Sequence, residues 1–165
     1  MVPQAPRVTF EPTVADDAEA LVAIRIAAMR ESLERLGRFD PQRARDRFLA
    51  SFEPAQTRHV LADRERVGLV VVRDQGDGLL LDHLYLLPRV QGRGIGAAVL
   101  ADVLARADAS RLPVRVAALR GSAANRFYQS HGFEQVQQDE WDNLYRRPAL
   151  PPLDARDAAV EPPAR

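Results

Sequence analysis

The stretch LLLDHLYLLPRVQGRGIG, residues 79–96, decides how this chain folds. Residues 79–87 are almost all apolar, which is typical of a strand covered on both faces. Pro88 interrupts this strand, and a glycine-rich turn over residues 91–96 then leads into an Ala/Val/Leu run that predicts a helix. Such a turn directs several backbone N–H groups toward one point beside the positive end of a helix dipole. The stretch therefore predicts an anion site, and a phosphate is its natural occupant.

Composition excludes several kinds of chemistry and partner. The chain has 165 residues, which suits one domain, and its formal net charge is zero, so we expect neither nucleic acid nor a membrane surface as a partner. All basic residues are arginine, which excludes Schiff-base lysines and the lysine of a P-loop. Cysteine is absent and the three histidines lack metal-ligand spacing, so no metal is expected. Without a signal-like or membrane-spanning apolar run, the expected location is cytoplasmic.

The apolar pattern predicts an α/β fold of the α+β type, with helices on a mixed, mostly antiparallel sheet. Expected strands cover residues 7–11, 59–62, 67–72, 79–87, 113–119, 133–137 and 141–146, and expected helices cover about 16–36, 40–53, 94–109 and 122–131. The order β-α-α-β-β-β-α-β-α-β-β thus gives roughly six or seven strands and about four helices. Residues 1–147 are predicted to form one domain, and the proline-rich residues 148–165 an extended or disordered tail.

Local signals predict where the helices begin and end. Asp16 and Glu19 stand at the spacing of a capping box before the first helix. Gly37 is placed to end that helix in a left-handed conformation, and Asp40 is placed to cap the next one. Ser122 is the expected cap of the last helix.

Two short motifs follow one another along the chain. Residues 91–96, QGRGIG, match the pattern Q/R-x-x-G-x-G/A, and residues 84–88 before them look like a preceding strand. Residues 124–133, ANRFYQSHGF, match the pattern A-x-x-F-Y-x-x-x-G-F. Together the two motifs resemble the GNAT superfamily of acetyl-CoA-dependent N-acetyltransferases, and the element order extends this resemblance over residues 7–147. One glycine motif is a weak signal, but two motifs in this order and on these elements are specific.

The resemblance implies acetyl-CoA as co-substrate. The pantetheine arm would pair with the backbone of Leu84 and Leu86, as an added strand does. The pyrophosphate would lie on the turn and the start of the helix, which contain Gln91, Gly92, Arg93, Gly94, Ile95, Gly96 and Ala97. Asn125 would either bond to the cofactor or bridge the backbone of the turn before its helix, and both readings stay open.

The resemblance also implies catalytic roles. The Leu86 N–H would polarise the acetyl carbonyl, and Tyr128 would donate a proton to the departing sulfur. The alternative for Tyr128 is that its ring only packs against the sheet. For the general base we expect Asp82, which by the period of two lies on the same strand face as Leu84 and Leu86, whereas His83 would face the other way.

The implied function is transfer of an acetyl group to a primary amine of a small molecule or peptide. Residues expected near this acceptor are Arg25, Met29, Arg30, Phe39, Phe52 and Trp141. An arginine there would suit a carboxylate or phosphate on the acceptor. The sequence names no particular acceptor and does not give the oligomeric state, although exposed edges of the last hairpin could pair in a homodimer.

Two alternatives stay open at this point. Gly92, Gly94 and Ala97 resemble a degenerate dinucleotide fingerprint, and Arg120 ends the next strand, where the 2′-phosphate of NADP could bind. Against this reading, residues 88–91 separate the strand from the turn, whereas a Rossmann turn follows its strand at once. The other alternative is a non-catalytic acyl-CoA-binding module, because the sequence shows no evident base.

Overall fold

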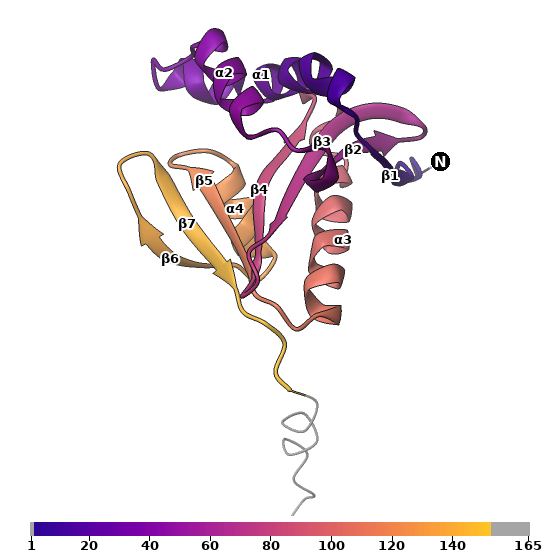
Figure 1. Ribbon diagram of the computed structural model, residues 1–165, viewed down its shortest axis with the longest axis vertical. Helices are drawn as coiled ribbons and strands as arrows, with labels where there is room; N and C mark the ends of the chain where they lie inside the picture. Colours follow the sequence, from indigo (N-terminus) through magenta and orange to yellow (C-terminus); the bar gives the residue numbers. More distant parts are fainter. Residues whose placement is uncertain (1, 153–165) are drawn as a thin grey trace, which may run out of the picture. The chain divides into compact units, whose positions relative to one another are not determined.

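The computed structural model describes residues 2–152, and its elements follow the predicted order (Figure 1). The strands are β1 (Val8–Pro12), β2 (Thr57–Ala62), β3 (Glu65–Asp74), β4 (Leu79–Leu86), β5 (Val114–Leu119), β6 (Glu134–Gln138) and β7 (Asp142–Arg147). The helices are α1 (Ala18–Arg35), α2 (Pro41–Ser51), α3 (Ile95–Ala109) and α4 (Ala124–Ser130). The predicted fold class is therefore confirmed. Most of the predicted tail, residues 153–165, lies outside the described residues.

The described strands form a sheet in the order β1-β2-β3-β4-β5-β7-β6. Antiparallel pairing joins β1 to β2 and β2 to β3, and likewise β5 to β7 and β7 to β6. The described chain divides into two compact units, residues 2–73 with 81–103, and residues 74–80 with 104–152. The single domain predicted for residues 1–147 thus stays a prediction. No helix of the described chain is both long and apolar enough to cross a membrane.

Helix α1 begins later than predicted, after a short 3₁₀ turn (Ala15–Asp17). The Val14 N–H donates a hydrogen bond to Asp17 Oδ2 over 2.8 Å, and the Asp17 N–H donates to the Val14 carbonyl over 3.0 Å. The reciprocal pair thus involves Asp17, so the predicted capping box of Asp16 and Glu19 is wrong. The prediction failed because Asp17 pairs with Val14, whose side chain cannot accept a hydrogen bond and which therefore gives no capping signal in the sequence, while Glu19 bonds to Arg45 instead.

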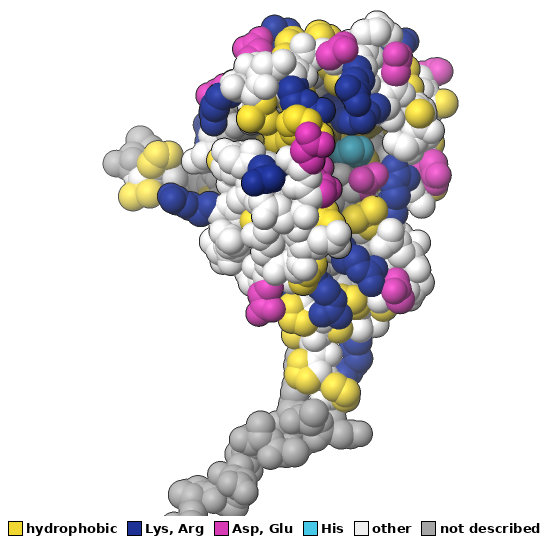
Figure 2. All heavy atoms as spheres, turned by 90° about the vertical axis from the view of Figure 1, so that its left-hand side faces the viewer, with side chains coloured by type: hydrophobic (Ala, Val, Ile, Leu, Met, Phe, Trp, Pro, Cys, Tyr) yellow, Lys and Arg dark blue, Asp and Glu magenta, His cyan; other side chains and the backbone are white. Residues whose placement is uncertain are grey.

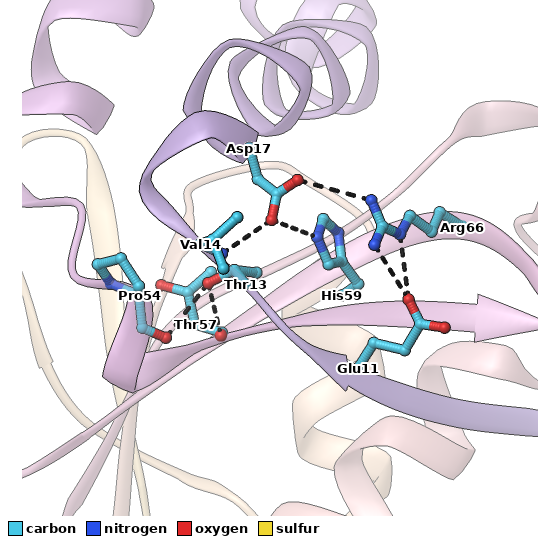
Figure 3. A network of polar contacts seen from close by, with 8 residues as sticks. All are labelled: Glu11, Thr13, Val14, Asp17, Pro54, Thr57, His59 and Arg66. Atoms are coloured by element: carbon cyan, nitrogen blue, oxygen red, sulfur yellow. Dashed lines mark hydrogen bonds and ion pairs between the residues drawn. The ribbon is translucent and has the colours of Figure 1, made fainter.

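The Asp17 carboxylate also anchors α1 to the sheet of the first unit (Figure 3). Its Oδ2 atom lies 3.1 Å from Nε2 of His59, a residue of β2 that is almost completely buried. Arg66 on β3 lies 3.6 Å from the other carboxylate oxygen and donates to Glu11 on β1 over 3.1 Å. These contacts connect the start of α1 to three neighbouring strands.

The other predicted helix ends can be compared with the structure one by one. Gly37 follows α1 with φ +66°, and Asp40 Oδ1 accepts a hydrogen bond from the Arg43 N–H over 3.1 Å at the start of α2, so both predictions are confirmed. The predicted Ser122 cap of α4 is wrong. Its hydroxyl instead donates to the Leu119 carbonyl over 2.7 Å, because the chain is still turning out of β5 at that point.

One hydrophobic core cluster of the first unit lies between α1, α2 and the strand β3. Its fully buried members are Leu21, Val22, Phe48, Leu69 and Val71. Phe52 and Tyr85 pack against this cluster from its edge. The side chains of α1 and α2 therefore cover one face of the central strands, and β4 contributes Tyr85 to the same face.

Candidate active site

The hydrogen bonds of the β3–β4 hairpin show one extra residue in β4. At the turn, the Gln75 N–H donates to the Gly78 carbonyl over 2.9 Å. At the far end, the Leu87 N–H donates to the Val67 carbonyl, also over 2.9 Å. Regular pairing counted from the turn would place Leu86 opposite Val67 instead. Strand β4 therefore contains a β-bulge, at which the alternation of side chains is broken.

The bulge lies at Asp82 and His83, because both side chains lie on the face covered by α2. The Asp82 carboxylate accepts a hydrogen bond over 2.8 Å from Arg73, which also donates to the Ser51 carbonyl at the end of α2. The His83 ring lies 6.0 Å from the ring of Phe48, in the middle of α2. The prediction that Asp82 shares a strand face with Leu84 and Leu86, while His83 faces the other way, is therefore wrong. Asp82 lies on the face of His83 and Tyr85, whereas the Leu86 side chain lies against Gly68 on the opposite face, since the period of two does not hold across a bulge.

Asp82 is held in place by its two neighbours. Its Oδ2 atom takes the hydrogen bond from Arg73 and lies 3.8 Å from Nε2 of His83. The pKa of His83 is lowered to about 4, chiefly because burial disfavours the charged form; Asp82 opposes this shift, and Arg25 and Arg73 add to it. The imidazole is therefore neutral near pH 7, and its Nδ1 atom lies 3.2 Å from the hydroxyl of Tyr85. Whether Asp82 acts as the base stays a prediction.

The glycine turn has the conformation that glycine permits. Gly92 and Gly94 have φ values of +75° and +82°, and a Cβ on either would meet no atom within 4 Å. Glycine is therefore needed at these two positions for the left-handed backbone conformation, and not for lack of space. The Ala98 N–H donates to the Gly94 carbonyl over 3.1 Å, which is the first hydrogen bond of α3. Within residues 2–152, no hydrogen bond is recorded from the N–H groups of residues 92–97, so these donors are available to an anion.

The end of β4 is connected directly to this turn. Since the Leu87 N–H points to β3, the backbone groups of Leu86 point to the opposite edge of the strand. There the Leu86 carbonyl accepts a hydrogen bond over 2.9 Å from Nε2 of Gln91. Gln91 thus has a role that the sequence did not predict, in addition to its predicted place in the cofactor site.

Arg89, two residues before Gln91, is paired with Glu65 on β3 over 2.6 Å.

Tyr128 lies in α4 of the second unit and is only 6% exposed. Its ring centre lies 5.4 Å from that of Phe133 and 6.5 Å from that of Tyr145. The Tyr128 ring therefore packs against its neighbours, as the alternative interpretation of this residue predicted. The predicted role as proton donor is compatible with this packing, because a tyrosine hydroxyl extends beyond its ring, and it stays a prediction.

Asn125 bridges the elements of the second unit. Its Nδ2 group donates to the carbonyls of Leu119 and Ser122 over 2.9 and 3.0 Å. Its Oδ1 atom accepts hydrogen bonds over 2.8 Å from Asn143 Nδ2 and from the Tyr145 hydroxyl. The amide thus makes the four hydrogen bonds that it is able to make. A contact of Asn125 with the cofactor stays a prediction, and no signal in the sequence pointed to its partners on β7.

Comparison with known protein families places these features in context. The family model described as "Acetyltransferase (GNAT) domain" matches residues 26–144, which is most of the chain. The chain belongs to the GNAT acetyltransferase family. The resemblance seen in the two motifs is thereby confirmed, and so is the prediction of an acyltransferase. Among curated proteins, no significant match to this GNAT sequence is found.

Solved structures with the same fold include several acetyltransferases. PaiA N-acetyltransferase from Thermoplasma acidophilum, in complex with coenzyme A, superposes with a TM-score of 0.71 at 14% identity, covering 86% of this chain and 99% of that one. An acetyltransferase from Thermus thermophilus gives 0.69 at 18% identity, covering 87% and 98%. The ribosomal-protein-S18-alanine N-acetyltransferase from Escherichia coli gives 0.68 at 14% identity, covering 90% and 98%. At these identities the similarity shows the fold.

Proposed function

We propose that this GNAT protein transfers the acetyl group of acetyl-CoA to a primary amine of a small molecule or peptide. The observation that carries the proposal is the glycine turn with its unbonded N–H groups at the start of α3, in a chain of this family. Coenzyme A in the structurally similar PaiA N-acetyltransferase is consistent with acetyl-CoA as co-substrate here.

The N–H groups of Gly92 to Ala97 would hold the pyrophosphate of the co-substrate. Positive φ at Gly92 and Gly94 turns successive peptide groups toward a common point, as in other anion-binding turns. Leu84 and Leu86 would pair with the pantetheine amides. The direction of the Leu86 backbone, away from β3, supports this pairing, because an N–H group that points out of a strand edge can pair with an added strand.

In the reaction, the amine nitrogen bonds to the acetyl carbon and the carbon–sulfur bond breaks. The Leu86 N–H would stabilise the negative charge that develops on the acetyl oxygen. Asp82 would take the proton that the amine loses, directly or through water, and Tyr128 would give a proton to the sulfur. The hydrogen bond from Arg73 fixes the Asp82 carboxylate through Oδ2, which leaves Oδ1 as the proton acceptor.

Ligand-induced stabilisation of the purified protein tests the cofactor part of the proposal. We expect acetyl-CoA and CoA to raise the melting temperature, because a ligand that binds only the folded state stabilises it by mass action. NADPH should have no effect. Stabilisation by NADPH alone would support the dinucleotide-binding alternative and overturn the proposal.

Release of free thiol from acetyl-CoA tests the catalytic part. The panel of acceptors should span small amines, amino acids, aminoglycosides and peptide N-termini. We expect thiol release with at least one of these classes above the rate without acceptor. Stabilisation by acetyl-CoA without amine-dependent thiol release from any class would instead support the non-catalytic acyl-CoA-binding module.

A further inference from the structure

Helix α1 buries an arginine that has no anionic partner. Arg25 is only 9% exposed, and among the described residues no other arginine is classed as buried. Its Nε atom is shielded from solvent and has no hydrogen-bond acceptor, and within residues 2–152 no carboxylate is recorded within 4 Å of its guanidinium. Within residues 2–152, its two terminal nitrogens make no recorded hydrogen bond, and neither is a fully shielded atom without a partner. Both nitrogens therefore keep access to solvent.

The aromatic neighbour of Arg25 is Tyr85 on β4, which begins a series of ring contacts that extends to α2. The guanidinium lies 5.9 Å from the ring centre of Tyr85, and the rings of Tyr85 and His83 stack at 5.3 Å. Phe48 lies 6.0 Å from His83 and stacks on Phe52 at 5.6 Å. We call these five residues the Arg25 cluster. Figure 2 shows one face of the molecule, on which arginine and acidic side chains lie among hydrophobic ones.

Arg73, in the same unit, differs from Arg25 because its guanidinium is hydrogen-bonded to several acceptors. It donates to Asp82 over 2.8 Å and to the Ser51 carbonyl over 2.9 Å, and it also bonds to Gln56. Arg25 has none of these contacts, and its cation–π contact with Tyr85 offsets only part of the cost of removing a charge from water. An apolar side chain would fill the position of Arg25 more favourably if packing were its only role.

The charge of the Arg25 cluster limits the kind of anion that it suits. His83 is neutral near pH 7 because burial lowers its pKa to about 4, and the positive charge of Arg73 is balanced by Asp82. One uncompensated positive charge remains, on Arg25. A single guanidinium with two open terminal NH2 groups matches the planar, singly charged carboxylate, whereas a phosphate dianion is usually bound by several cations.

From this arrangement we infer that Arg25 binds a carboxylate of the acceptor, so that the preferred acceptor is a small amino acid with an apolar or aromatic side chain. The inference rests on the proposed function and deepens it. The terminal nitrogens of Arg25 hold the carboxylate end-on, and Tyr85, whose ring lies beside the guanidinium, contacts the apolar part of the same molecule. Arg25 is thus a specificity-determining residue that takes no part in proton transfer.

Matched pairs of acceptors test the inference. Phenylalanine and phenethylamine differ only in the carboxylate, and kcat/KM for the amino acid should be about 10- to 100-fold higher, as expected for one charge-assisted hydrogen-bonded pair. In Arg25→Gln this preference should disappear through a rise in KM for phenylalanine, while KM for acetyl-CoA stays unchanged. Arg35→Gln, on an exposed part of the same helix, is the control and should keep the wild-type preference.

A binding measurement separates this inference from the proposed function. Titration calorimetry with N-acetylphenylalanine and N-acetylphenethylamine in the presence of CoA needs no turnover. We expect the acid to bind at least about 10-fold more tightly than the neutral amide, and this difference to be lost in Arg25→Gln. Equal binding of both compounds to the wild-type protein would overturn the inference, even if acetyl transfer to amines occurs.

The stability of an Arg25 variant gives a second, independent readout. Arg25→Met removes the uncompensated charge and keeps the side-chain length, so the melting temperature should be unchanged or higher. A clear fall in the melting temperature of this variant would mean that Arg25 stabilises the hydrophobic core, which would contradict the inference. A wild-type preference for phenylalanine that persists in Arg25→Met would contradict it as well.

Discussion

The side chain of Gln91 donates a hydrogen bond over 2.9 Å to the main-chain carbonyl of Leu86. It connects the last residue of β4 to the first residue of the glycine turn. In the proposed function, Leu86 aligns the acetyl group and the turn binds the pyrophosphate, at opposite ends of one long molecule. The distance between these two binding points is then controlled by Gln91.

Replacement of Gln91 by leucine should weaken the binding of acetyl-CoA. Loss of the hydrogen bond and loosening of the turn should raise KM for acetyl-CoA by about 5- to 30-fold, equivalent to about 1–2 kcal/mol, with a smaller change in kcat. Steady-state kinetics with varied acetyl-CoA measures the effect. Gln42→Leu is the control, because Gln42 makes a comparable side-chain bond to Asp46 on exposed α2. Equal KM values in the two variants would contradict this role of Gln91.

Replacement of Gly94 by alanine should also affect the cofactor. A residue with a Cβ at φ +82° is strained by about 1–2 kcal/mol, and relief of this strain turns the peptide groups of the turn away from their common point. We expect a lower melting temperature and at least about 10-fold weaker binding of CoA by calorimetry.

The control for this variant is Gly76→Ala, in the β3–β4 turn. Gly76 has the same φ of +82° and equally open surroundings, so the strain should lower the melting temperature by a similar amount. Its affinity for CoA should match that of the wild-type protein. If both variants bind CoA equally well, the glycine turn at residues 91–96 is not the pyrophosphate site.

The sequence predicted the order of the elements correctly because each element carries its own local signal. Period-two and helical patterns alternate along the chain, and glycine with positive φ marks helix ends such as Gly37. Capping was harder to predict, since Asp17 pairs with the backbone of Val14, a residue type that the capping rule does not select. Local patterns thus predict that an element exists better than they predict its first residue.

The candidate site was predicted less completely, because much of it depends on contacts between distant residues. The bulge at Asp82 and His83 depends on the register of two strands, and no residue type in the sequence marks it. Likewise, Asn125 finds its partners Asn143 and Tyr145 only once β7 lies beside β5. The two GNAT motifs, by contrast, are local, which is why the turn and Tyr128 could be proposed from the sequence.

Replacement of Tyr128 by phenylalanine tests the proposed general acid. The variant keeps the ring that packs against Phe133 and loses the hydroxyl, so kcat should fall by about 10²–10⁴-fold. Tyr145→Phe is the matched control. It loses the hydroxyl bond to Asn125 and should be destabilised by about 1 kcal/mol, but it should retain its kcat. An unchanged kcat in Tyr128→Phe would eliminate this residue as the acid.

His83 should make the folded protein sensitive to acid. Its pKa is about 4 in the folded state, where burial disfavours the charged form, and about 6.5 when unfolded. Between these values the unfolded chain binds a proton that the folded chain does not, so the free energy of unfolding decreases as the pH falls from about 6.5 to 4. At about 1.4 kcal/mol for each pKa unit, the loss contributed by His83 is on the order of 3 kcal/mol. Urea denaturation at pH 7 and pH 4.5 should therefore show a smaller difference in His83→Gln than in the wild-type protein or in His131→Gln. An imidazole resonance of His83 that titrates near pH 6.5 in the folded protein would contradict this prediction.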